Sequence, residues 1–162
     1  MRSVQSIPNK IFTLPALQQQ LKRWRLLNKK IVFTNGVFDI LHQGHIASLS
    51  EAACHGHVLI VGVNADASVK KLKGDSRPVN GQDSRALLLA SLTMTDAVVI
   101  FEEETPYNLI TAVMPDVLVK GGDYTIETIV GAKEVIANGG EVIIAPILEG
   151  FSTTAIIARM KK

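Results

Sequence analysis

Short apolar runs rich in valine and isoleucine alternate with helical stretches along most of this chain, and this alternation restricts the possible folds more than any other feature. Alternation of this kind indicates βαβ units. The runs are almost continuously hydrophobic, which is typical of parallel strands covered by helices on both faces. The expected strands are Ile31–Thr34, Val58–Val63, Ala97–Phe101, Val117–Val119 and Glu141–Ala145.

The stretches between these runs have the apolar spacing of helices. Parallel strands joined by right-handed helical crossovers build an open sheet with helices on both faces. We therefore expect an α/β, Rossmann-like fold with a doubly wound parallel sheet of five strands. The expected helices are Gly44–Cys54, Asp83–Leu92, Pro106–Val113, Thr128–Asn138 and Thr153–Met160.

One more helix is expected before the first strand. Thr13 followed by Pro15 is typical of a helix start, and apolar residues recur after it at helical spacing. The 162 residues, 47% of them hydrophobic, suffice for one compact core and leave little room for a second. We expect residues 1–29 to form a helical extension and residues 30–162 to form the single domain.

Composition argues against partners with large charged surfaces. The formal net charge is only +2, so no strong field marks a nucleic-acid or membrane surface. The basic stretch at residues 22–30 is interpreted as a solvated helix face rather than a polyanion contact. Cys54 is the single cysteine, and neither a signal peptide nor a run of roughly 18 apolar residues is found. We expect a soluble, cytoplasmic protein that binds neither nucleic acid nor membrane.

The end of the first expected strand carries a dense group of polar residues, from Asn35 to His45. Gly36 and Gly44 allow a ligand to approach the backbone closely, and a helix that starts there offers free N–H groups and the positive end of its dipole. His42 and His45, three residues apart, can both direct ring nitrogens into this cradle and donate hydrogen bonds to phosphoryl oxygens. A lone histidine is usually a surface or core residue, and paired histidines also bind metals. The strand-to-helix setting favours a phosphate site.

Two further clusters follow later strands. Lys120, two glycines and Asp123 come after the fourth strand, where the lysine suits a phosphate and the carboxylate suits a ribose or a metal. The alternative there is an ordinary Gly-Gly turn. Ser152, Thr153 and Thr154 stand at the start of the last helix. One of them would suffice as a helix N-cap, so three consecutive hydroxyl residues favour phosphate contact.

The longest irregular stretch is expected at Lys70–Gln82, which contains two glycines and a proline. Long ordered loops often carry function. Four cations fall within eight residues of this loop, and Arg85 follows on the next helix. A charged surface loop and a lid over bound phosphates are both open interpretations. The four cations are Lys70, Lys71, Lys73 and Arg77.

The segment 35–45 resembles the cytidylyltransferase-like superfamily, whose His-x-Gly-His motif falls on residues 42–45 and whose terminal Ser-Thr-Thr motif falls on residues 152–154. More narrowly, five segments in the same order resemble the bacterial D-glycero-β-D-manno-heptose 1-phosphate adenylyltransferases. The resemblance extends over residues 10–160. The five segments are Thr34–Asp39, Val63–Val69, Leu72–Gly74, Arg77–Asn80 and Leu118–Tyr124.

The resemblance implies transfer of AMP from ATP to D-glycero-β-D-manno-heptose 1-phosphate, which gives ADP-heptose and pyrophosphate for the inner core of lipopolysaccharide. It also implies a magnesium requirement. The expected partners are ATP, a sugar phosphate and other copies of the chain in a homo-oligomer. A separate heptose kinase and a phosphatase would act in the same pathway; in many bacteria the kinase is fused to this domain. The expected nucleotide-binding residues are Asn35, Gly36, Phe38, His42, Gly44, His45, Lys120, Asp123, Ser152, Thr153 and Thr154.

On the sugar-phosphate side the candidates are Asp39, Arg77 and Arg85, while Lys73 joins the two motif histidines as a catalytic candidate. We expect direct in-line attack of the substrate phosphate on the α-phosphorus of ATP, without a covalent enzyme intermediate. The attacking phosphate is already anionic, so the enzyme needs orientation and charge stabilisation more than a base. The histidines, Lys73 and magnesium would supply that charge. The sequence assigns no metal ligands.

Other functions on the same scaffold are open. The nearest is another nucleotidylyltransferase, acting on glycerol phosphate, phosphopantetheine or a nicotinamide nucleotide. Against the glycerol-phosphate branch, Ile147 and Leu148 stand where that branch has an arginine before Thr-Glu-Gly. A regulatory nucleotide-binding module is a second possibility, because fold and cradle alone do not establish catalysis. An aminoacyl-tRNA synthetase fragment has a similar histidine motif, but this short, nearly neutral chain has no obvious tRNA-binding region.

Overall fold

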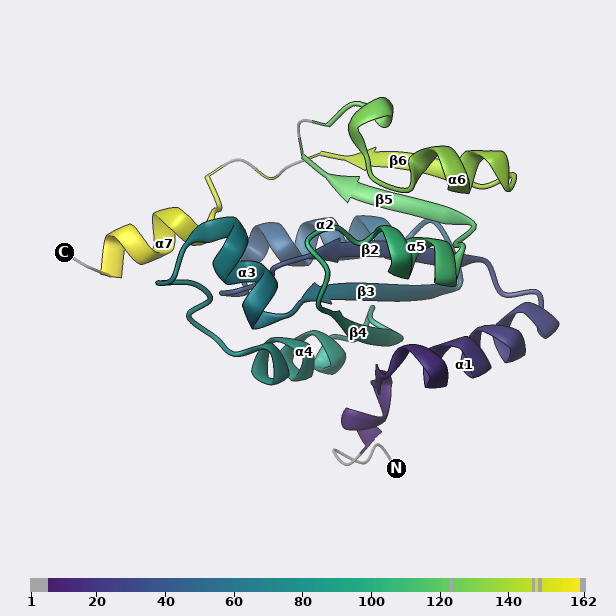
Figure 1. The fold of residues 1–162 in the computed structure, drawn as a ribbon, viewed down its shortest axis with the longest axis horizontal. Coiled ribbons are helices and arrows are strands. Elements are labelled where there is room, and N and C mark those ends of the chain that lie inside the picture. The colour runs from purple at the N-terminus through teal and green to yellow at the C-terminus, as the bar shows by residue number, and fades with distance from the viewer. Residues whose placement is uncertain (1–5, 123, 147, 149, 161–162) are drawn as a thin grey trace.

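The computed structural model describes residues 6–122, 124–146, 148 and 150–160. In this part of the chain, one parallel sheet has the strand order β1-β4-β3-β2-β5-β6 (Figure 1). The expected α/β, Rossmann-like, doubly wound sheet is confirmed, but it has six strands rather than five. The strands are β1 Ile11–Phe12, β2 Ile31–Gly36, β3 Val58–Asn64, β4 Ala97–Phe101, β5 Val117–Gly121 and β6 Glu141–Ala145.

The helices follow the expected order, with one interruption. The stretch Thr128–Asn138, expected as one helix, is divided at Gly131, where φ is +81°. A side chain on Gly131 would lie 2.7 Å from Cγ2 of Ile110, so this close approach requires glycine. The α-helices are α1 Leu14–Leu26, α2 Gln43–Ala53, α3 Asp66–Lys73, α4 Gln82–Ser91, α5 Tyr107–Val113, α6 Ala132–Ala137 and α7 Thr153–Met160; the 3-10 turns are η2 Pro8–Lys10 and η3 Ile126–Thr128.

Strand β1 and helix α3 were not expected from the sequence. β1 has only two residues, too few to show a strand pattern, and it pairs with β4 at the edge of the sheet. The N-terminal extension therefore contributes a strand as well as α1. Lys70–Lys73 form the last turn of α3, so the loop begins at Gly74 rather than at Lys70. The charged surface of α3 hides its helical period, because Ser68 and Val69 are its buried residues.

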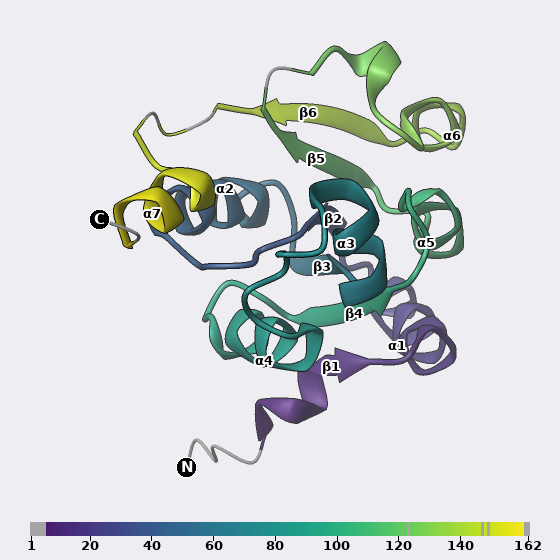
Figure 2. The same ribbon diagram turned by 60° about the vertical axis from the view of Figure 1, so that its left-hand side comes forward.

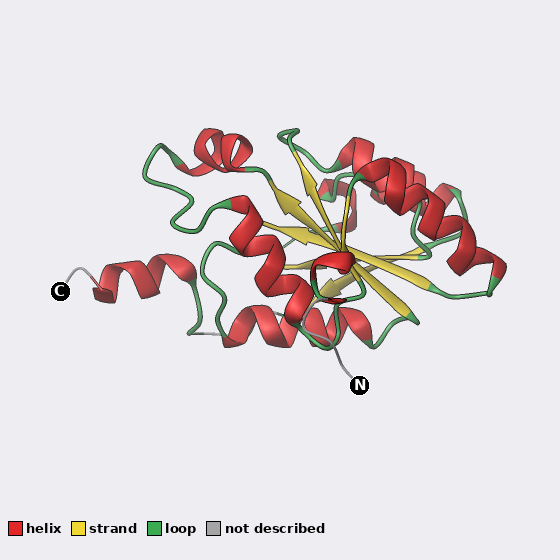
Figure 3. Cartoon of the chain, turned by 90° about the horizontal axis from the view of Figure 1, so that it is seen from below, coloured by secondary structure: helices red, strands yellow, loops and turns green. Residues whose placement is uncertain are grey.

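Helices lie on both faces of the sheet, which Figures 2 and 3 show from two directions, and the sheet separates two hydrophobic clusters. Helices α1, α5 and α6 cover one face, and α2 and α4 cover the other. All seven residues of β3 are buried. Leu17 and Leu21 fix α1 to the sheet, and burying each such side chain contributes roughly 1.5–3 kcal/mol. The core thus holds the strand ends in a fixed frame.

The strand order reverses between β2 and β5, and the sheet opens there. β2 pairs with β3 as far as Gly36, but it pairs with β5 only at Val32↔Val117 and Phe33↔Leu118. Both strands continue beyond these pairs, through Thr34–Gly36 and Val119–Gly121. These described segments form no further ladder pairs with each other. Ligands of open parallel sheets bind at such a switch point.

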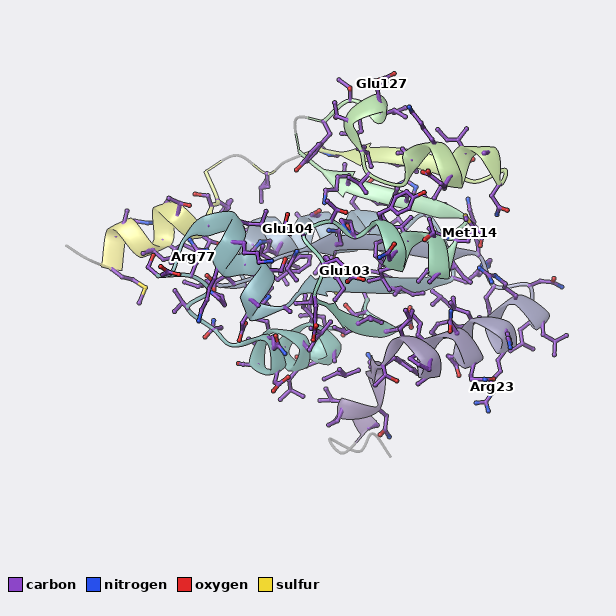
Figure 4. All side chains as sticks on the ribbon, in the orientation of Figure 1. Arg23, Arg77, Glu103, Glu104, Met114 and Glu127 are labelled. Atoms are coloured by element: carbon purple, nitrogen blue, oxygen red, sulfur yellow. The ribbon has the colours of Figure 1, made fainter. Side chains whose placement is uncertain are left out.

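Helix α7 differs from the other α-helices described, because no residue in it is buried. It extends beyond the sheet at the carboxyl ends of the strands (Figures 1 and 3). Figure 4 places Arg77 and Glu104 toward this end of the molecule and Met114 and Arg23 toward the opposite end. None of the helices in the described ranges has the length and apolarity that a membrane span requires.

Candidate active site

Side chains bridge the opening between β2 and β5. Nζ of Lys120 donates a hydrogen bond to Oδ1 of Asn35 at 3.1 Å and lies 5.6 Å from the centre of the Tyr124 ring. Burial lowers the pKa of Lys120, because desolvation disfavours the ammonium ion. A half-buried cation with a neutral partner is well suited to bind an anion. The structure therefore brings two of the expected site residues together.

A cavity of about 440 Å³ lies at this opening, and we call it the Lys120 cavity. Its volume is within the usual range for small-molecule sites. Its walls come from the ends of β2, β3 and β5, from α3 and from the loop after β4. Its lining includes Gly36, which was expected, and Asn64, which was not. The polar lining residues are Asn35, Asn64, Lys73, Glu104, Thr105, Lys120, Tyr124 and Thr128.

The two motif histidines lie at the start of α2. Phe38 turns the chain with a left-handed φ of +49° and is buried, and its ring meets the ring of His45 edge-on with 5.2 Å between centroids. The rings of His42 and His45 stack, with centroids 3.8 Å apart and planes at 19°. Nδ1 of His42 is buried and has no hydrogen-bond partner within the described ranges. This nitrogen faces Gly44, where a Cβ atom would lie 3.1 Å from it.

Burial favours the neutral form of both histidines. Burial lowers the pKa of His42. Burial also lowers the pKa of His45 to about 4; His42 and Lys73 act in the same direction, and the backbone of Ile40 opposes them. Neutral imidazoles donate hydrogen bonds but carry no charge. The role of the two histidines in supplying charge to bound phosphates stays a prediction, and Lys73 and Lys120 are cations beside them.

A second cavity, of about 310 Å³, lies between the starts of α2 and α7, and we call it the histidine cavity. Oγ of Ser152 accepts a hydrogen bond from the N–H of Ala155 at 3.1 Å. The N-cap interpretation therefore applies to Ser152, while the next two hydroxyl residues also line the cavity. The lining residues include His42, Gly44, His45, Ser48, Lys73, Gly121, Phe151, Ser152, Thr153 and Thr154.

Lys73, at the end of α3, joins the cavities. It lines the Lys120 cavity, the histidine cavity and a third cavity of about 670 Å³. The third one, the Arg77 cavity, also contacts Arg77 and Thr154. The Lys120 and histidine cavities share Gly121 as well. One cation is therefore common to three adjoining spaces at the switch point.

Asp39 fixes the loop that follows α3. It is 1% exposed, and its Oδ2 accepts a hydrogen bond from Nε of Arg77. Its Oδ1 accepts from the N–H groups of Val79 and Asn80 at 2.8 and 2.9 Å. The Asn80 side chain donates back to the carbonyl of Asp39 at 2.7 Å. We call this set of bonds the Asp39 latch; it occupies the carboxylate that was expected to contact the sugar phosphate.

Arg85, also expected on the substrate side, is 0% exposed and lines none of the three cavities. Its guanidinium donates to Oδ1 of Asp66 at 2.8 Å and to three backbone carbonyls. It therefore ties the ends of β2 and β3 to the starts of α3 and α4. These bonds give it a structural role. The carbonyls belong to Val37, Asn64 and Asn80, at 2.6, 2.8 and 2.9 Å.

Three residues that line the cavities were not among the site residues expected from the sequence: Asn64, Tyr124 and Phe151. One expected residue lies outside the part of the chain that the structure describes. This residue is Asp123, so its expected role stays a prediction. Tyr124 ends one of the segments that carry the resemblance, and Phe151 precedes the hydroxyl cluster, but neither was assigned a site role, because an aromatic residue beside a turn gives no specific sequence signal. Asn64 ends β3 and was identifiable in principle from its position at a strand end. Within the described ranges, no group of three histidine, cysteine or acidic residues is arranged to hold a metal.

A Rossmann-like sheet whose switch point carries a His-x-Gly-His turn opposite a hydroxyl-rich helix start defines a nucleotide-binding α/β domain. The chain belongs to the cytidylyltransferase-like family, whose sequence profile matches residues 33–159. This membership makes it a nucleotidyltransferase, as the motifs predicted.

The chain is similar to two proteins named Bifunctional protein HldE. It is 53% identical to that of Hyphomonas neptunium over 149 residues and 52% identical to that of Koribacter versatilis over 150 residues. These matches cover 92% and 93% of this chain but 31% of each relative, so the chain spans about a third of their length.

Two solved structures are also similar. A lipopolysaccharide core biosynthesis protein from Thermoplasma volcanium is 28% identical with a TM-score of 0.58, covering 74% of this chain and 97% of that one. The pantoate-β-alanine ligase of Francisella tularensis, solved with an ATP ligand and β-alanine, is 16% identical with a TM-score of 0.61, covering 93% of this chain and 76% of that one. The second likeness concerns the fold alone.

Proposed function

We propose that the chain transfers AMP from ATP to D-glycero-β-D-manno-heptose 1-phosphate and releases pyrophosphate. The observation that carries the proposal is the position of Lys73, which borders three adjoining cavities. Two anionic reactants have to meet at one phosphorus atom, and a shared cation lowers their repulsion. The heptose is favoured by the motif resemblance, by the HldE relatives and by the similarity to a lipopolysaccharide core biosynthesis protein.

The triphosphate of ATP belongs, in this proposal, to the histidine cavity. Two helix starts border that cavity, and free N–H groups at helix starts bind phosphates. Neutral His42 and His45 would donate hydrogen bonds to phosphoryl oxygens, and Thr153 and Thr154 would add hydroxyl donors. The pyrophosphate would leave past Lys73 toward the Arg77 cavity.

The sugar phosphate belongs to the Lys120 cavity. Lys120 would bind its phosphate, while the amides of Asn35 and Asn64 and the carboxylate of Glu104 suit sugar hydroxyls. This assignment moves Asn35 and Lys120 from the nucleotide side, where the resemblance placed them, to the acceptor side. Arg85 is left out, because its donors are already used within the protein.

The chemistry is a single in-line displacement. An oxygen of the acceptor phosphate forms a bond to the α-phosphorus, the bond from that phosphorus to the bridging oxygen breaks, and pyrophosphate leaves with the electron pair. No proton has to be removed from the acceptor, so no general base is required. Magnesium usually binds substrate phosphates and one or two carboxylates. Bound to the triphosphate of ATP, the ion would supply positive charge to the leaving group.

The proposal is tested by pyrophosphate release from purified protein with magnesium, ATP and the heptose 1-phosphate, beside CTP with glycerol 3-phosphate. Heptose-dependent release with ATP is the expected result. Release only with CTP and glycerol 3-phosphate would assign the chain to a sister branch. ATP binding without release for either acceptor would favour a regulatory module.

A further inference from the structure

Phe151, in the segment between β6 and α7, contacts the histidine pair. Its ring is nearly parallel to that of His42, with 6.5 Å between centroids and 25° between planes. His42 stacks in turn on His45, which meets the edge of Phe38. Ring contacts of this geometry are attractive beyond simple burial. A continuous series of four rings therefore links the turn after β2 to the start of α7.

Gly44 allows this contact. A Cβ atom there would lie 3.1 Å from Nδ1 of His42 and 3.2 Å from Cβ of Phe151, closer than ordinary van der Waals contact. Phe151 thus approaches α2 at Gly44, the position where the helix has no side chain. The motif glycine serves ring packing as well as access for phosphate.

Helix α7 has few other contacts in the described residues: Ile156 and Ile157 are partly buried, and Thr154 and Ile157 border the Arg77 cavity. None of its side chains is buried, and Ser152 makes a bond only within the helix start. Thr153 and Thr154 follow Phe151 directly in the chain and line the histidine cavity. The distance from these hydroxyls to the imidazoles therefore depends on how Phe151 is seated.

We propose that Phe151 is a positioning residue, which by stacking on His42 holds the starts of α2 and α7 in register around one triphosphate. This inference rests on the proposed function and deepens it. The residue need not touch the reacting atoms. Its effect is to make the hydroxyls of α7 and the imidazoles of α2 converge on the same ligand.

Substitution of Phe151 separates binding from chemistry. Loss of one aromatic contact weakens ligand binding, so Phe151→Ala should raise the KM for ATP roughly 3- to 10-fold. The change in kcat should be smaller, and the KM for the sugar phosphate should not change. Phe151→Tyr keeps the ring and should restore the KM. Leu148→Ala is the matched control, because Leu148 is 37% exposed in the same segment and Phe151 is 38% exposed. A Tyr variant as impaired as the Ala variant would overturn the proposal.

A readout without catalysis keeps this test independent of the proposed function. The ring-proton NMR signals of His42 should shift in Phe151→Ala and stay in place in Leu148→Ala, because the neighbouring ring is lost only in the first. The affinity for inorganic tripolyphosphate should fall by the same factor as the rise in KM. If the wild-type protein transfers no adenylyl group, the proposed function fails while these two measurements still decide the role of Phe151. Unchanged His42 signals and unchanged affinity would refute it.

Discussion

The starts of α2 and α7 border the same cavity, yet the protein holds them in different ways. α2 is anchored in the core through Leu49 and Ala52, and the turn before it is fixed by the Asp39 latch. α7 has no buried side chain, and the ring of Phe151, two residues before the helix, stacks on His42 at the start of α2. Segments with few buried contacts open more easily than core elements. The site therefore has a rigid side, the start of α2 with His42 and His45, and a lightly held side, the start of α7 with Thr153 and Thr154.

The largest effect is expected from breaking the rigid side. Asp39→Ala removes a buried carboxylate and leaves Arg77, 12% exposed, and two N–H groups without their acceptor. The free energy of unfolding should fall by about 3 kcal/mol, as when one partner of a buried ion pair is removed. Urea unfolding followed by circular dichroism measures it. Asp75→Ala, an exposed change in the same loop, should cost less than about 0.5 kcal/mol; equal losses would contradict the latch.

The same carboxylate predicts a pH dependence of stability. Burial alone would raise the pKa of Asp39, but the hydrogen bonds from Asn80, Arg77 and Val79 outweigh burial and lower it from 3.8. A carboxyl group with a lower pKa in the folded protein contributes stability above about pH 4 and loses it as the pH falls through the folded pKa. Below pH 4 the wild-type protein should lose stability more steeply than Asp39→Ala. Parallel curves for the two proteins would contradict this assignment.

The next effect concerns catalysis on the rigid side. His45→Ala should lower kcat by about 100-fold or more, or about 2.7 kcal/mol in activation free energy, by analogy with the loss of a transition-state hydrogen-bond donor. Steady-state pyrophosphate release gives the rate, and circular dichroism checks the fold. His55→Ala, just past the other end of α2, should keep wild-type turnover. A folded His45→Ala protein with normal turnover would exclude the role proposed for this imidazole.

The smallest effect is expected on the lightly held side. Ser152→Ala removes the acceptor of the Ala155 N–H group, which costs about 1 kcal/mol in the local stability of α7. The KM for ATP should rise about 5-fold, while the global free energy of unfolding should not change, because no residue of α7 is buried. A fall in global stability as large as that of Asp39→Ala would show that α7 belongs to the rigid frame.

Where a residue's own chemistry and its neighbours in sequence determine its environment, the sequence was enough. Strands β4 and β6 were predicted with their observed ends, because continuous Val and Ile runs end sharply there, although β4 is buried and β6 lies at the edge of the sheet. The cradle from Asn35 to His45 was predicted as a strand-to-helix turn, and it is one. Glycine, histidine and hydroxyl residues at the ends of strands and helices predict the local backbone geometry, because that geometry depends on nearby residues in the sequence.

Where contacts with residues distant in the sequence determine a side chain's role, the sequence did not predict that role. Arg85 carries a charge that suits a phosphate, but its carbonyl partners come from positions up to 48 residues away. Asp39 is likewise engaged by a loop about 40 residues later. Phe151 takes its role from a ring brought over α2 by the path of the chain after β6. Such long-range pairings leave no pattern in a single sequence.

The early end of pairing between β2 and β5 has a consequence for backbone protection. Amide groups alternate between the two edges of a strand. In Thr34–Gly36, those directed at β3 stay in a ladder, whereas those directed at β5 do not. Slowly and rapidly exchanging amide hydrogens should therefore alternate along three residues in the middle of the sheet. The least protected backbone of the central strands would then coincide with the surface where the reactants meet.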